Sequence, residues 1–147
     1  MRMDGSAMTE QLCAVQCRYM KEFSTILQTV LLQGESGILF CLHRSGKPVC
    51  AGTLVEQLGL TSGRVANILK GLESRHLIHR VTGKDDRRLV MVSLTEEGKS
   101  EAALRYHRME ETHRSILSCM DEEDAKSLLR LTETVMSRLR AGTLKIG

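Results

Sequence analysis

The feature that most constrains the fold is residues 51–98, where a short and a longer helical pattern meet at a tight turn, and two β-rich runs and the start of another helix follow. Thr53 and Glu56 predict a capping box on the first helix, and Gly59 predicts its end. Thr61 is placed to cap the second helix. The pattern therefore predicts a helix-turn-helix. The apolar residues that would wedge its two helices together are Leu54, Leu58, Leu60, Val65 and Ile68. Leu69 and Leu72 extend the buried stripe at helical spacing.

The second helix of this pair directs polar residues away from its apolar stripe. Ser62, Arg64, Asn67 and Lys70 fall on that outer face. A helix fits the major groove of DNA, where arginine bonds guanine and asparagine bonds adenine. The pattern favours Arg64 and Asn67 as base readers, with Thr61 or Ser62 holding a phosphate at the helix start.

Two β-rich runs, at 77–81 and 89–94, flank a charged tip at 82–88. Gly83 favours a turn within the tip, and the charged side chains there require water. A hairpin directly behind the second helix of a helix-turn-helix is typical of a wing. The sequence therefore predicts a winged helix-turn-helix.

The string Asp86-Arg87-Arg88, then LVMVS, then Leu94-Thr95-Glu96-Glu97-Gly98 resembles the D-x-R…L-T-x-x-G signature of the MarR family of bacterial regulators. The resemblance covers roughly residues 35–120, with helix-turn-helix, wing and signature in the family's order. It implies a mainly α fold with a small β-wing, in which long N- and C-terminal dimerisation helices flank the winged helix-turn-helix. It also implies a homodimer that binds double-stranded DNA, and a short strand near 49–51 that pairs with the wing.

The same resemblance assigns roles to the wing residues. Arg88 would enter the minor groove, with Asp86 steering it and with Lys84 and Arg87 on the flanking phosphates. A plain surface arginine is the alternative interpretation of Arg88. Two such units in a dimer would read a pseudo-palindrome with half-sites about one helical turn apart.

Charge is distributed unevenly along the chain. The net charge of the protein is +3, yet residues 61–95 alone hold seven basic and three acidic side chains. This positive field falls on the second helix and the wing, where phosphates would lie. An ordinary solvated surface would carry the same charge, so charge alone leaves both interpretations open.

Long helices are predicted on both sides of the winged region, which spans 35–95. One helix runs from Met8 to Leu31 before Gly34, within a dimerisation segment at 8–34, and a shorter helix follows at 35–44. The segment 96–142 holds two more helices, which Thr95 and Asp121 would cap. Their apolar seams would be exposed in a monomer, so the sequence predicts a dimer. The seam residues are Ala102, Tyr106, Met109, His113, Ile116 and Met120 on one helix, and Ala125, Leu128, Thr132, Val135 and Leu139 on the other.

Length and composition agree with a single helical domain spanning residues 1–147. One proline and 3% aromatic residues argue against a β-sandwich. No apolar run reaches membrane-spanning length, and the N-terminus lacks the apolar core of a signal peptide. We therefore expect a soluble cytoplasmic protein without a membrane partner. Five cysteines, an odd number without paired spacing, indicate reduced thiols.

The effector is open. Members of the family respond to phenolic or lipophilic ligands, to oxidants through a thiol, or to metal ions. Cys13 and Cys17, four residues apart on the first helix, are candidate sensing thiols that resemble the family's peroxide-sensing branch. That branch supports its thiolate with tyrosines on the second helix, whereas this chain has only Tyr19 and Tyr106. Small buried hydrophobes are the alternative role of the cysteines.

A metal site is not predicted. Cys41, His43 and Cys50 could join His107 or His113, but their spacing forms no recognised zinc set. No cofactor is predicted either.

The sequence thus predicts a DNA-binding transcriptional repressor, a homodimer on a pseudo-palindromic operator that an unidentified effector releases. One alternative is a winged-helix module that binds protein, which would have no need of Arg64, Asn67 and Arg88 on the two groove-reading elements. The other is a thiol- or metal-dependent sensor or enzyme. An enzyme is disfavoured because no nucleophile has an adjacent base in the sequence.

Overall fold

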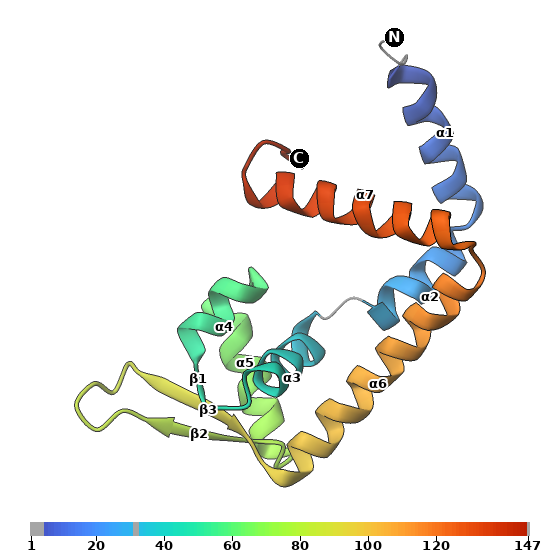
Figure 1. The fold of residues 1–147 in the computed structure, drawn as a ribbon. Coiled ribbons are helices and arrows are strands. Elements are labelled where there is room, and N and C mark those ends of the chain that lie inside the picture. Colours follow the sequence, from blue (N-terminus) through green and yellow to red (C-terminus); the bar gives the residue numbers. More distant parts are fainter. Residues whose placement is uncertain (1–4, 31–32, 147) are drawn as a thin grey trace. The chain divides into compact units, whose positions relative to one another are not determined.

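The computed structural model describes residues 5–30 and 33–146. The chain divides into two compact units, one ending at Met109 and the other beginning at Glu110, and each is described by itself. Within the described residues the protein has seven helices and one three-stranded antiparallel sheet, so the predicted mainly α fold with a small β-wing is confirmed (Figure 1).

The N-terminal segment forms two helices, α1 (Gly5–Arg18) and α2 (Met20–Val30), instead of the single helix predicted from 8 to 31. The chain bends between α1 and α2 (Figure 1). Tyr19 is the one non-helical residue between them, although helical hydrogen bonding crosses the bend. The Tyr19 N–H donates to the Val15 carbonyl at 3.1 Å, and the Phe23 N–H donates to the Tyr19 carbonyl at 2.8 Å. The prediction was wrong because neither glycine nor proline marks the bend. Leu31 lies outside the described residues.

Helix α3 (Gly34–Ser45) ends at Gly46, whose φ of 63° is the left-handed conformation that glycine tolerates. The Gly46 N–H donates to the Leu42 carbonyl at 3.2 Å and closes the helix. The predicted short strand is present as β1 (Val49–Cys50), where Val49 pairs with Val92.

Helix α4 (Ala51–Leu58) begins earlier than predicted. Cys50 is its N-cap, in extended conformation and without a side-chain cap, so the predicted capping role of Thr53 is wrong. The reason is that β1 runs directly into the helix, which places Thr53 inside the first turn. Gly59 ends α4 with a φ of 61°, as predicted.

Helix α5 (Ser62–Ser74) completes the helix-turn-helix. Thr61 caps it as predicted, since its Oγ1 accepts the Arg64 N–H at 3.2 Å. Of the seven apolar residues predicted to wedge the two helices together or to extend their buried stripe, four are buried and three are half-buried against the core. The core consists of Ile38, Leu39, Leu42, Leu54, Val65, Leu69, Leu72, Ile78, Val92 and Ala102.

The wing is a hairpin of β2 (Ile78–Thr82) and β3 (Val90–Leu94), and the strand order is β1-β3-β2. At its tip the Gly83 N–H donates to the Leu89 carbonyl at 2.7 Å. A Cβ at Gly83 would lie 2.7 Å from the Asp86 carbonyl oxygen, so the tip requires glycine there. The predicted wing is therefore confirmed, each strand within one residue of its expected limits.

Helix α6 (Glu96–Ser118) starts directly behind β3. The buried Thr95 hydroxyl donates to the His76 carbonyl at 2.6 Å and accepts the Gly98 N–H at 2.9 Å. The Thr95 N–H donates to the Leu77 carbonyl at 3.1 Å. Thr95 therefore caps α6, as predicted, and also holds the helix start against the chain that enters the wing.

Helix α7 (Glu122–Arg140) belongs to the second unit. Asp121 caps it as predicted, because its Oδ1 accepts the Asp124 N–H at 2.8 Å. Three acidic residues in the first turn and two arginines in the last complement the helix dipole. Among the described residues, no helix combines the length and apolar character that crossing a bilayer would require.

Candidate nucleic-acid interface

The outer face of α5 carries the predicted groove-reading residues. Ser62, Arg64, Asn67 and Lys70 are all exposed, whereas Val65 and Leu69 on the opposite face are buried. The apolar stripe thus fixes which side of the helix faces outward. That side offers an amide and a guanidinium, the two groups that read adenine and guanine edges in pairs of hydrogen bonds.

The start of α5 is suited to an anion. The N–H groups in the first turn of a helix have no partner within the helix and sit at the positive end of its dipole. The exposed Thr61 hydroxyl oxygen accepts the Arg64 N–H, and its proton stays available to a phosphate oxygen. Ser62 adds a second exposed hydroxyl beside it.

The tip of the wing holds the second group of predicted residues. It is the loop that joins β2 to β3 (Figure 1). Lys84, Asp86, Arg87 and Arg88 are all exposed in this loop. The Arg88 N–H donates to Asp86 Oδ1 at 2.9 Å. Asp86 thus acts on the backbone at Arg88, which orients the arginine through the shape of the turn.

Two of the seven basic residues in the positive field are engaged within the protein. Arg75 Nη2 lies 2.5 Å from Glu35 Oε1. Arg80 bonds Glu73 through two nitrogens, and its Nε lies 2.8 Å from Glu73 Oε2. The hydrogen bond from Arg80 holds the pKa of the Glu73 carboxyl below its ordinary value. These pairs were missed in the sequence because no helical or strand periodicity brings their members together.

The Glu73–Arg80 pair ties the wing to α5. Glu73 lies in the last turn of α5 and Arg80 in the middle of β2, opposite Val92 of β3. The ion pair also raises the pKa of Arg80, so both groups stay charged at neutral pH. An ion pair therefore links the middle of β2 to α5, in addition to the pairing of β2 with β3, and the tip of the wing is exposed.

The candidate sensing thiols lie on α1, where Cys13 and Cys17 are both exposed. They line a cavity of about 770 Å³ together with Met20, Phe23 and Leu27 of α2. Cys41 is half-buried, and this burial raises the pKa of its thiol, which disfavours the reactive thiolate. In the part of the chain that the structure describes, no three His, Cys, Asp or Glu side chains gather as a metal site would require.

Known proteins resemble the chain in sequence. The model of the MarR family matches residues 33–90. YhbI of Bacillus subtilis, described as an uncharacterized HTH-type transcriptional regulator, is 35% identical over 88 residues, which are 58% of this chain and 52% of YhbI. YwaE of the same organism, described in the same words, is 27% identical over 86 residues, 58% of this chain and 50% of YwaE. The chain thus spans about half the length of these curated relatives.

Solved structures share the fold. FabT of Streptococcus pneumoniae, whose structure was determined in complex with DNA, matches with a TM-score of 0.71 and 21% identity over 94% of this chain and 99% of FabT. YusO of Bacillus subtilis matches with a TM-score of 0.68 and 19% identity over 92% of this chain and 99% of YusO. At these identities the likeness concerns the fold alone.

Proposed function

We propose that this chain, whose residues 33–90 match the model of the MarR family, is a winged helix-turn-helix transcriptional regulator that binds double-stranded DNA in a sequence-specific manner. One observation carries the proposal: the exposed face of α5 and the exposed tip of the wing belong to one compact unit and both present cations. The FabT structure contains DNA, and the two curated relatives are described as transcriptional regulators, which supports the same conclusion.

In this proposal α5 and the wing contact different parts of the DNA. On α5, Arg64 and Asn67 read base edges in the major groove, and Lys70 contacts the backbone. At the helix start, Thr61 and Ser62 hold a phosphate. On the wing, Arg88 enters the minor groove, Asp86 sets the turn that presents it, and Lys84 and Arg87 neutralise flanking phosphates.

The proposed regulator acts as a homodimer. Large apolar side chains are exposed along α1 and α2, and others are exposed along α7. A monomeric protein rarely exposes so much apolar surface to water, so we infer that a second copy of the chain buries this surface in a dimer interface. A two-fold dimer would present two copies of α5 and would read a pseudo-palindromic operator.

The proposed mode of action is repression relieved by an effector. The cavity of about 770 Å³ beside α1 and α2 has a volume suited to a small organic molecule. Cys13 and Cys17 are exposed on its wall, so oxidation of these thiols would be a second way to alter the same helices. A winged-helix module that binds protein is the other candidate, and the exposed guanidinium and amide on α5 favour DNA over it.

Selection of genomic DNA fragments by the purified protein tests the proposal. The selected duplex should bind at sub-micromolar concentration, and its affinity should fall steeply across a salt series because several cations contact phosphates. A duplex of scrambled sequence is the control. An affinity that is insensitive to salt, or equal for selected and scrambled duplexes, would exclude sequence-specific DNA binding.

A further inference from the structure

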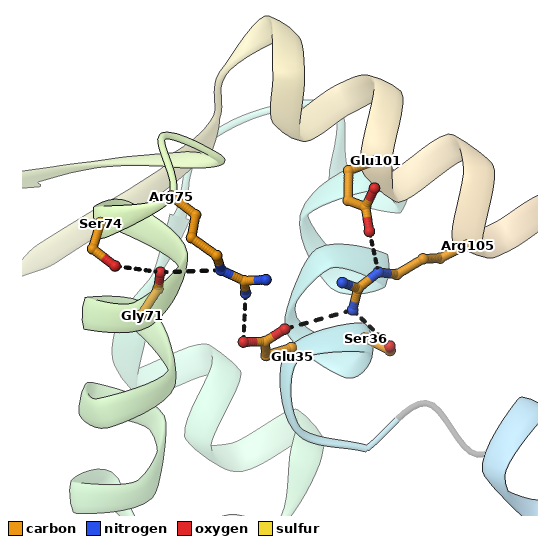
Figure 2. A network of polar contacts seen from close by, with 7 residues as sticks. All are labelled: Glu35, Ser36, Gly71, Ser74, Arg75, Glu101 and Arg105. Atoms are coloured by element: carbon orange, nitrogen blue, oxygen red, sulfur yellow. Dashed lines mark hydrogen bonds and ion pairs between the residues drawn. The ribbon is translucent and has the colours of Figure 1, made fainter.

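The carboxylate of Glu35, in the first turn of α3, lies between arginines from two other helices (Figure 2). Its Oε1 accepts a hydrogen bond from Arg75 Nη2 at 2.5 Å. Its Oε2 lies 3.7 Å from Arg105 Nη1. Arg75 is the C-cap of α5 and Arg105 belongs to the first half of α6, so one carboxylate joins three helices.

Each arginine is also held by partners other than Glu35. Arg105 Nε bonds Glu101 Oε1 at 2.6 Å, and Arg105 Nη1 donates to Ser36 Oγ at 3.1 Å. Arg75 Nε donates to the Gly71 carbonyl at 3.4 Å. The two guanidinium groups are therefore oriented before they meet Glu35, which reduces the loss of side-chain freedom that weakens most surface ion pairs.

Glu35, Ser36, Arg75, Glu101 and Arg105 form one group of polar contacts, the Glu35 cluster. This cluster gives the packing of α5 a directional component. The apolar contacts of Leu69 and Leu72 bury the helix, but the hydrophobic effect has no preferred direction. Hydrogen bonds weaken steeply when they are misaligned. The polar contacts at the end of α5 therefore add a directional restraint to its apolar packing.

We propose that Glu35 is a positioning residue that fixes the direction of α5 relative to the start of α6, and thereby sets the half-site spacing that the regulator accepts. The proposal rests on the function proposed above. Helix α5 and the start of α6 belong to the same compact unit, so Glu35 acts within that unit. In a dimer, the separation of the two copies of α5 then depends on the Glu35 cluster in each copy.

The test compares Glu35→Gln with the wild-type protein on a set of duplexes. The set holds the selected operator, the same operator with one base pair added or removed between its half-sites, and a single half-site. Glu96→Gln is the matched control, because it removes a carboxylate whose partner Lys99 lies in the same turn of α6. All three proteins are titrated under one salt condition.

The wild-type protein should prefer the selected spacing, and Glu35→Gln should reduce that preference by about fivefold, the change expected from losing one well-placed ion pair. Affinity for the single half-site should stay within about twofold of wild type, because the base contacts are intact. Glu96→Gln should keep the full preference. An unchanged spacing preference in Glu35→Gln, or an equal loss on every duplex, would overturn the proposal.

A second measurement needs no DNA. Amide hydrogen exchange at residues 71–77, where α5 ends, should be about fivefold faster in Glu35→Gln than in wild type, since the cluster holds that end. Glu96→Gln should leave exchange there unchanged, and unchanged exchange in Glu35→Gln would overturn the positioning role. If the wild-type protein bound no duplex selectively, the proposed function would fail, while the exchange measurement would still decide whether Glu35 positions α5.

Discussion

Gly98 lies so close to Leu77 that a Cβ built on it would sit 1.8 Å from the Leu77 carbonyl oxygen. That carbonyl also accepts the Thr95 N–H at 3.1 Å. The threonine and glycine of the L-T-x-x-G string are thus needed because the first turn of α6 rests on the backbone that leads into the wing. The string therefore has a packing role at the start of α6.

Gly98→Ala should destabilise the protein by about 3 kcal/mol, the upper end for overpacking, because the added methyl meets backbone and not a flexible side chain. Urea unfolding of both proteins measures the difference. Gly71→Ala is the control: a Cβ on Gly71 has no neighbour within 4 Å, and alanine stabilises a helix by up to about 1 kcal/mol. Equal stability of Gly98→Ala and wild type would contradict the close approach.

Thr95→Val keeps the shape of the side chain but removes its hydroxyl. The Gly98 N–H and the His76 carbonyl would each lose a partner, so unfolding free energy should fall by about 1–3 kcal/mol. Thr95→Ser keeps the hydroxyl, so its unfolding free energy should fall less than that of Thr95→Val. Thermal unfolding of the three proteins decides, and a valine variant as stable as the serine variant would show that the two hydrogen bonds contribute nothing.

The Glu73–Arg80 pair predicts a pH dependence of stability. Arg80 lowers the pKa of Glu73 below its ordinary value of 4.5. A carboxyl whose pKa is lower in the folded protein adds stability above its unfolded pKa, and that stability is lost as pH falls through the folded value. Glu73→Gln should therefore lower the melting temperature at pH 7, and the difference from wild type should shrink below pH 4.5.

The matched control for this pH series is the same substitution in an Arg80→Gln background. Without its partner, Glu73 should titrate near its ordinary pKa, so Glu73→Gln should have no effect specific to the pair. A difference between Glu73→Gln and wild type that stays constant from pH 7 to pH 3 would contradict the ion pair, since a protonated carboxyl cannot sustain it.

Arg88→Ala and Arg64→Ala should weaken DNA binding in different ways. Arg88→Ala should reduce affinity most for operators with A·T-rich flanks, because a narrow minor groove concentrates negative potential. Arg64→Ala should cost about 1–3 kcal/mol at one position of each half-site and relax the preference there. Binding to a library of single-base operator variants separates the two patterns. A uniform loss with both variants would refute the division between wing and helix.

The dimer prediction concerns α7, where Leu128 and Val135 lie seven residues apart and are 38% and 45% exposed. Replacing both with Asp would bury unpaired charges in a dimer interface at a cost of several kcal/mol, so sedimentation should detect a monomer and DNA affinity should fall. Arg130 and Ser137 have the same spacing on the opposite face, and replacing them with Asp is the control. A folded wild-type monomer at micromolar concentration would contradict an obligate dimer.

The sequence predicted best those features that residues within four positions of one another decide. The caps at Thr61, Thr95 and Asp121 and the stop at Gly59 depend on local atoms, and all four were predicted correctly. The core of the helix-turn-helix followed from periodicity in the same way. The cap predicted at Thr53 was wrong because Cys50 is the N-cap of α4 instead. Cys50 is held there by its pairing with Met91 of β3, which is distant in the sequence.

The candidate site was predictable only in part. Exposure of Arg64, Asn67 and Arg88 follows from the local pattern, and the structure has all three exposed. The local pattern does not predict the partners of Arg75 and Arg80. Glu35 lies 40 residues from Arg75 in the sequence, and Glu73 belongs to α5 whereas Arg80 belongs to β2. The DNA contacts and the dimer stay predictions, which the substitutions at Arg64, Arg88, Leu128 and Val135 test, and the effector stays a prediction as well.

Cys50 is at once the last residue of β1, paired with Met91, and the N-cap of α4. No spacer separates the sheet from the helix-turn-helix, so inserting a residue after Cys50 would turn α4 by about 100° and carry Leu54 out of the core. The wing tip at 82–88 lies outside the core, so an insertion there would leave Leu54 and the core in place. We therefore expect the junction at residues 50 and 51 to stay free of insertions in proteins that share this arrangement.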